Sequence, residues 1–140
     1  MKTKVYSAFP GCGKTTYFNE TDRNVLDSDS SKFDKRDFPK NYLDHIGRNV
    51  EDSTIDKILV SSHKEVRDGL VKNGIPFVLV YPERELKGEY LQRYKDRGNN
   101  DSFVEFLDGM WDEWMDEMDS QEGCYKVRLG KGQYLTDVID

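Results

Sequence analysis

The residues with the clearest chemical potential form the segment Ala8-Phe-Pro-Gly-Cys-Gly-Lys-Thr15. Gly13, Lys14 and Thr15 match the end of the phosphate-binding pattern G-x-x-x-x-G-K-[ST], whereas Ala8 replaces its first glycine. Glycines at positions 11 and 13 allow backbone conformations that a Cβ atom disfavours, so successive N–H groups can point at an anion. We therefore expect phosphate binding; a tight strand-to-helix turn with an incidental lysine is the alternative.

Two carboxylates, Asp27 and Asp29, follow the next apolar stretch and lie two residues apart. At this spacing in an extended chain, side chains point to the same side. Both could therefore face the ligand crevice beyond the carboxyl ends of an open α/β sheet. There a carboxylate could receive a proton from a hydroxyl group of a bound substrate, bind a metal or hold a sugar hydroxyl. A turn or helix cap formed by residues 27–31 is the alternative.

The apolar segment 56–61 is followed by Ser62 and His63 and not by an acidic residue. A metal would therefore have to be oriented by a serine, a water molecule, or Asp27 and Asp29. His63 could titrate near neutral pH, or simply stand in solvent at the start of a helix. Three arginines could bind an anionic group of an acceptor or face solvent: Arg36, Arg48 and Arg67.

The stretch Phe9-Pro-Gly-Cys-Gly-Lys-Thr-Thr16 resembles the loop of P-loop nucleoside and nucleotide kinases, including the proline–glycine pair of adenylate-kinase-like enzymes. The short chain, residues 27–31 and the segment Leu86–Asn99 resemble small phage-encoded kinases of nucleotides, or of hydroxymethylated pyrimidines in DNA. The resemblance implies ATP and Mg²⁺ as cofactors, with the loop and its lysine on the β- and γ-phosphates and Thr15 on the metal. The loop residues concerned are Pro10, Gly11, Cys12, Gly13, Lys14, Thr15 and Thr16.

The same resemblance implies roles outside the loop. Asp29 or Asp27 would position the acceptor and receive its proton, or Asp27 would bind Mg²⁺. A lid over about residues 83–100 would bring Arg93 and Arg97 over the transferred phosphoryl group, because the two are four apart on one helix face. The alternative is a solvated helix face on which the glutamate one turn earlier pairs with Arg93.

Alternating strands and helices must position these residues. The sequence predicts strands at 4–9, 24–26, 56–61, 75–81 and 123–129, and helices at 14–20, 39–48, 62–73, 84–97 and 102–118. Two Ser-x-x-Glu sequences, 62–65 and 102–105, predict capping boxes. The alternation predicts a single three-layer α/β domain over residues 1–140, with a five-stranded, mostly parallel sheet and a helical lid. Residues 31–54 would form an acceptor-binding insertion.

Charge is unevenly distributed along the chain. The net charge is −6, but residues 101–122 carry nine acidic residues and no Lys or Arg. The helix there has an apolar stripe that predicts a core-facing side and a solvated acidic side; a partner-binding surface is the alternative. The stripe contains Phe103, Leu107, Met110, Trp111, Trp114 and Met118. The negative charge favours a small acceptor, although DNA stays possible.

Composition narrows the class of protein. Hydrophobic residues make up 36% of the chain, and no apolar run approaches the roughly 20 residues of a membrane span. The two cysteines, Cys12 and Cys124, have no metal-binding spacing, and Cys12 is either an activated thiol or a small residue that fits the loop. We expect a cytoplasmic ATP-dependent phosphotransferase with a nucleotide-like acceptor. A non-catalytic nucleotide-binding regulator is the alternative, and the oligomeric state is not predicted.

Overall fold

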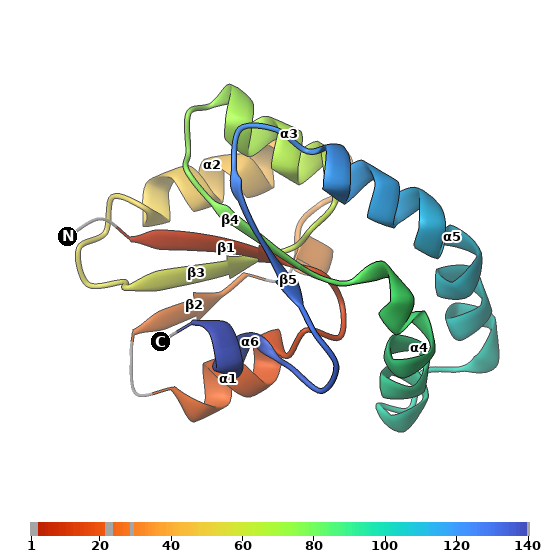
Figure 1. Ribbon diagram of the computed structural model, residues 1–140. Coiled ribbons are helices and arrows are strands. Elements are labelled where there is room, and N and C mark those ends of the chain that lie inside the picture. The colour runs from red at the N-terminus through yellow and green to blue at the C-terminus, as the bar shows by residue number, and fades with distance from the viewer. Residues whose placement is uncertain (1–2, 22–23, 29, 140) are drawn as a thin grey trace.

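The computed structural model describes residues 3–21, 24–28 and 30–139. Its sheet has five parallel strands in the order β2-β3-β1-β4-β5 (Figure 1). The strands are β1 (Lys4–Ala8), β2 (Val25–Asp27), β3 (Lys57–Val60), β4 (Val78–Pro82) and β5 (Tyr125–Leu129). The predicted strand number and parallel arrangement are confirmed, but β4 begins three residues later than predicted.

Helices cover both faces of the sheet. They are α1 (Lys14–Glu20), α2 (Lys40–Asn49), α3 (Lys64–Lys72), α4 (Lys87–Asp96), α5 (Asp101–Ser120) and α6 (Leu135–Val138), with short 3₁₀ turns at Ser30–Lys32 and Arg84–Leu86. Figure 1 shows α2 and α3 over one face and α1 and α6 over the other, while α4 and α5 pack together beyond the end of β4. The predicted three-layer α/β architecture is therefore confirmed.

The strand order places a topological switch point at the carboxyl ends of β1 and β3. The chain leaves β1 toward the face covered by α1, whereas it leaves the adjacent β3 toward the face covered by α3 (Figure 1). Ligands of open α/β sheets bind where neighbouring strands diverge in this way. The fold thus places the ends of β1 and β3, and the residues that follow them, around this switch point. We call this region the crevice, because ligands of open α/β sheets bind there.

The α5 helix supplies a large part of the core. Trp111 is 1% exposed, its ring contacts Phe9 edge-on at 5.7 Å, and its Nε1 donates to the carbonyl of Arg84. The buried side of α5 consists of Val104, Leu107, Trp111, Met115 and Met118. The predicted core-facing side is confirmed, but Phe103 is 42% exposed. Val104, the next residue, is buried in its place.

Both predicted capping boxes are wrong. His63 occupies the N-cap of α3 and makes no side-chain cap bond. At α5 the N-cap is Asn100, whose side-chain oxygen accepts from the amide of Phe103 at 2.8 Å. Asparagine caps helices as well as serine does, so the N-cap of α5 lies two residues earlier than predicted.

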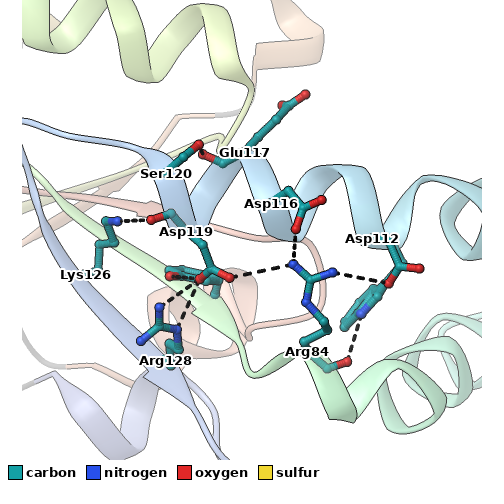
Figure 2. A network of polar contacts seen from close by, with 10 residues as sticks. Arg84, Asp112, Asp116, Glu117, Asp119, Ser120, Lys126 and Arg128 are labelled. Carbon is teal, nitrogen blue, oxygen red and sulfur yellow. Dashed lines mark hydrogen bonds and ion pairs between the residues drawn. The ribbon is translucent and has the colours of Figure 1, made fainter.

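The acidic side of α5 is not merely solvated, because much of it is paired with basic residues (Figure 2). Arg84, just after β4, forms ion pairs with Asp112, Asp116 and Asp119. Arg128 of β5 forms a 2.8 Å ion pair with Asp119. The charge imbalance along the sequence is therefore balanced in space, and the network fastens α5 to the ends of β4 and β5.

Acid should weaken this network. Burial by itself would raise the pKa of Asp119, but hydrogen bonds from Tyr81 and Arg128 lower it below its usual value. Because the folded pKa is below the unfolded one of about 3.9, the stabilisation is complete above that value and is lost as pH falls below it. We expect the free energy of unfolding to fall more steeply below about pH 4 in the native chain than in Asp119→Asn.

Urea denaturation followed by tryptophan fluorescence measures these slopes. Asp112→Asn is the matched control, because Asp112 is 77% exposed in its side chain and meets Arg84 only at 3.6 Å. Identical pH slopes in the native chain and Asp119→Asn would show that the network has no such role.

No helix of the described residues is long and apolar enough to span a membrane.

Candidate phosphate-binding site

The loop between β1 and α1 has the backbone that its glycines predict. Gly11 and Gly13 have φ values of 91° and 92°, in the left-handed region where a Cβ atom is disfavoured. Close contacts also require glycine: a Cβ at position 13 would lie 3.1 Å from Cδ1 of Tyr134. Ala8 instead ends β1 opposite Val80 of β4 and is fully buried. Ala8 is therefore a strand residue, and its departure from the motif leaves the turn intact.

Three consecutive carbonyls of the loop are held from outside. Tyr94 Oη donates to Pro10 O at 2.7 Å, Arg93 Nη1 donates to Gly11 O at 2.7 Å, and the amide of Leu135 donates to Cys12 O at 2.8 Å. In a trans peptide the C=O and N–H groups point in opposite directions. Carbonyls held outward at positions 10 and 12 therefore orient the N–H groups of the following glycines toward the inside of the loop.

Arg93 is the centre of this support. Its guanidinium lies between the rings of Tyr90 and Tyr134, with Cζ 4.2 and 3.9 Å from the two ring centroids. It also forms a 2.8 Å ion pair with Glu89 and donates to Gln133 O at 3.0 Å. The pairing with the glutamate one turn earlier is thus confirmed, although on a buried face of α4 and not on a solvated one. Arg93 supports the loop from behind.

The C-terminal segment was not predicted as part of the site. Glu89 accepts from the amide of Gly132, and Tyr134 covers both Gly13 and Arg93. One signal could have revealed this: the segment follows the last parallel strand, so it must emerge at the carboxyl edge of the sheet, beside the loop. We call residues 132–135 the C-terminal latch.

Most of the other predicted residues of the site lie near the loop. Lys14 donates to Ala8 O at 3.1 Å, Thr15 and Thr16 are exposed at the start of α1, and Asp27 ends β2 beside Leu59 of β3. Asp29 lies outside the described residues. Arg97 is exposed at the end of α4, in contrast to Arg93. These positions lie at the carboxyl ends of the strands or on the helix behind the loop.

Three arginines lie elsewhere or are already engaged. Arg67 is 2% exposed, which excludes the solvent-facing alternative, and donates to Ser62 O and Gln121 Oε1 at 2.8 Å each. Arg36 is exposed and pairs with Asp34 at 2.8 Å. Arg48 lines a cavity of about 1390 Å³ at the amino ends of β1 and β4, opposite the loop. Arg48 is therefore not placed to bind an acceptor in the crevice, which corrects that expectation.

His63 and Lys14 are electrostatically coupled across the crevice. Desolvation lowers the pKa of His63, and the charges of Lys14 and Arg67 lower it further against the opposing effect of Glu65. Desolvation and these charges favour the neutral imidazole, so the pKa of His63 lies below its ordinary value. His63 is exposed at the N-cap of α3, as the alternative of a residue in solvent at a helix start expects.

Cys12 is a buried structural residue. Burial raises the pKa of its thiol to about 11, and its Sγ lies 3.7 Å from Tyr90 Oη. The interpretation of an activated thiol is wrong, since desolvation outweighs the favourable charges nearby. Cys12 is the small residue that fits the loop.

We expect Cys12 to resist alkylation in the folded protein. At pH 8 a thiol of pKa 11 is ionised to only about one part in a thousand, against roughly a quarter for an ordinary cysteine. Iodoacetamide treatment followed by peptide mass spectrometry should label half-buried Cys124 first and Cys12 only after unfolding. Labelling of Cys12 in the folded chain at the rate of the unfolded chain would contradict this assignment.

Comparisons with known proteins give a likeness of fold. No family model matches the chain, and no curated protein sequence does. Among solved structures the chain is similar to a gluconokinase from Sinorhizobium meliloti 1021, with a TM-score of 0.52 and 13% sequence identity over 97% of this chain and 86% of that one. At such low identity the likeness concerns the fold alone: the chain shares the α/β fold of that gluconokinase.

Proposed function

We propose that this protein is an ATP-dependent phosphotransferase that moves the γ-phosphoryl group to a nucleotide-like acceptor. The observation that carries the proposal is the loop at the carboxyl end of β1, with two left-handed glycines and its carbonyls held outward by α4 and the C-terminal latch. A loop fixed in this way presents N–H groups to an anion without reorganisation when the anion binds. Lys14, one residue beyond Gly13, adds a positive charge for the β- and γ-phosphates.

Mg²⁺ fits the donor groups at this end of the sheet. The described residues contain no cluster of three or more His, Cys, Asp or Glu that could hold a metal by itself. Mg²⁺ commonly binds through one or two protein oxygens together with substrate phosphates. Thr15 at the start of α1 and Asp27 at the end of β2 are oxygen donors of that kind. Bound there, the cation would neutralise charge on the transferred group.

The two arginines of α4 take different roles in this proposal. Arg93 is committed to the loop carbonyl and to two aromatic rings, so it positions the loop and does not move to the phosphoryl group. Arg97 is exposed and follows the last turn of α4, so it supplies the charge that stabilises the transition state. The proposed lid, about residues 83–100, would then deliver only Arg97 from its exposed side.

The acceptor would bind between the ends of β2 and β3. Tyr42 of α2 donates to Ser28 O and accepts from the amide of Ser61, so residues 31–54 are tied to this part of the crevice. We propose that Asp29 or Asp27 positions the acceptor hydroxyl, and that Arg36 or Arg67 would need to rearrange to contact an acceptor anion. A nucleoside monophosphate or a hydroxymethylpyrimidine in DNA is the acceptor we favour.

A non-catalytic nucleotide-binding protein is the second candidate. It is favoured by the end of β3, where Ser61, Ser62 and His63 stand in place of a metal-orienting acid. It is also favoured by Arg93, which is drawn into the framework of the loop. Such a protein would bind ATP through the same loop and transfer nothing.

Transfer of labelled γ-phosphoryl from Mg-ATP to a panel of acceptors separates the two candidates. The panel holds nucleoside monophosphates, nucleosides, gluconate, and duplex DNA with and without hydroxymethylpyrimidine. Label that enters one acceptor, and is lost with Lys14→Ala or with EDTA, supports the phosphotransferase and identifies its acceptor. ATP binding that depends on Lys14 with no labelled acceptor supports the binding protein.

A further inference from the structure

Ser61 occupies a distinctive position in the crevice. In the register of β1 and β3, Ser7 lies opposite Val60, so Ser61, the residue directly after β3, follows at the level of Ala8. Ala8 is the residue whose carbonyl accepts from Lys14 Nζ at 3.1 Å. Ser61 therefore stands beside the beginning of the phosphate loop, directly after the strand at whose end a metal-orienting acid is missing.

The backbone of Ser61 is fixed on both sides. Its carbonyl accepts from Ser7 Oγ of β1 at 2.9 Å, and its amide donates to Tyr42 Oη at 3.2 Å. Tyr42 is fully buried and donates in turn to Ser28 O at 2.6 Å. These bonds hold the backbone of Ser61 between β1 and α2. The Cα–Cβ bond of Ser61 is therefore fixed in direction.

The hydroxyl of Ser61 nevertheless lacks a partner. Its Oγ is shielded from solvent and makes no hydrogen bond to any of the described residues. A buried hydroxyl of this kind has lost water without gaining another partner, which costs free energy. An alanine at position 61 would avoid this cost, because it has no hydroxyl. The Ser61 hydroxyl is therefore able to form a hydrogen bond to a ligand that it does not form within the described residues.

We propose that the Ser61 hydroxyl holds a water molecule of the hydrated Mg²⁺ that binds with the nucleotide, in place of the missing acid. The inference rests on the proposed nucleotide site. Mg²⁺ keeps several of its waters in proteins, and a neutral hydroxyl can accept a hydrogen bond from such a water. The neighbouring residues are less suited: Ser62 lies one residue further from β3, with its carbonyl bonded to Arg67, and His63 occupies the N-cap of α3.

Binding of Mn²⁺, used as a paramagnetic probe for Mg²⁺, tests this role without turnover. Free Mn²⁺ is measured by electron paramagnetic resonance in the presence of saturating ADP, for the native chain, Ser61→Ala and Ser62→Ala. Groups that orient metal ligands typically contribute tenfold or more in affinity, so we expect Ser61→Ala to weaken Mn²⁺ binding about tenfold. Ser62→Ala, the adjacent serine, should bind Mn²⁺ as the native chain does.

Two further measurements distinguish this role from a structural one. Ser61→Ala should keep the affinity for ADP in the absence of metal, and its melting temperature should equal or exceed that of the native chain because the orphan hydroxyl is gone. Native Mn²⁺ affinity in Ser61→Ala, or an equal loss in Ser62→Ala, would overturn the proposal while leaving the nucleotide site in place. Failure of the native chain to bind ADP at all would overturn the proposed function, and this inference with it.

Discussion

The Lys14→Ala variant is expected to transfer phosphoryl groups at least about a hundredfold more slowly than the native chain. Removal of one preorganised charge or donor from a site that stabilises transition-state charge commonly costs a hundred- to a thousandfold in kcat. Arg93 does not replace Lys14 easily, because its guanidinium is fixed to the carbonyl of Gly11 and packs against two aromatic rings. The measurement is kcat at saturating Mg-ATP with the acceptor that the panel identifies.

The matched control is Lys72→Ala, because Lys72 is an exposed lysine in the last turn of α3. Its kcat should equal that of the native chain. Circular dichroism melts of both variants check that the loss at position 14 is not caused by unfolding. A kcat within fivefold of native in a folded Lys14→Ala protein would mean that the loop does not carry the chemistry.

Much of the fold could be predicted from local patterns, because all five strands and every helix except α6 carry their own sequence signal. The apolar run 75–81 and the Asn73-Gly74 helix end mark β4 and the end of α3, and Gly74 has the expected left-handed φ of 68°. The predicted boundaries of elements were wrong where two sequence signals competed. Asn100 and Ser102 are both good caps, and only packing of α5 determines which one begins the helix.

The phosphate loop could be predicted because its residues are contiguous. The support of the loop could not, since it joins residues that are far apart in the sequence: Arg93 and Gln133 are forty positions apart. The spacing of Arg93 and Arg97 predicts one shared face, yet burial separates them. The ion pairs of α5 with Arg84 and Arg128 also could not be predicted, because they join residues from different elements of the fold.

The Arg93→Ala variant is expected to be the most destabilising substitution at the site. It removes the donors to Gly11 O and Gln133 O, leaves the carboxylate of Glu89 without its cation, and empties the space between two rings. Breaking a buried charged pair by removing one partner costs roughly 3 kcal/mol. For a domain of this size that corresponds to a fall in Tm of about 10 °C. Arg93→Lys should fall in between, because lysine keeps the charge but cannot stack or donate as a planar fork.

Arg97→Ala is the control on the same helix, four residues further and exposed. Its Tm should lie close to native, since surface substitutions usually change stability by less than about 0.5 kcal/mol. Its kcat should fall if Arg97 serves the transferred group. The two variants should therefore have opposite effects. Arg93→Ala should change mainly the melting temperature, and Arg97→Ala should change mainly kcat. A native melting curve for Arg93→Ala would contradict the role of the C-terminal latch. Native turnover in Arg97→Ala would remove the charge-stabilising arginine from the mechanism and leave Lys14 as the principal cation at the phosphates.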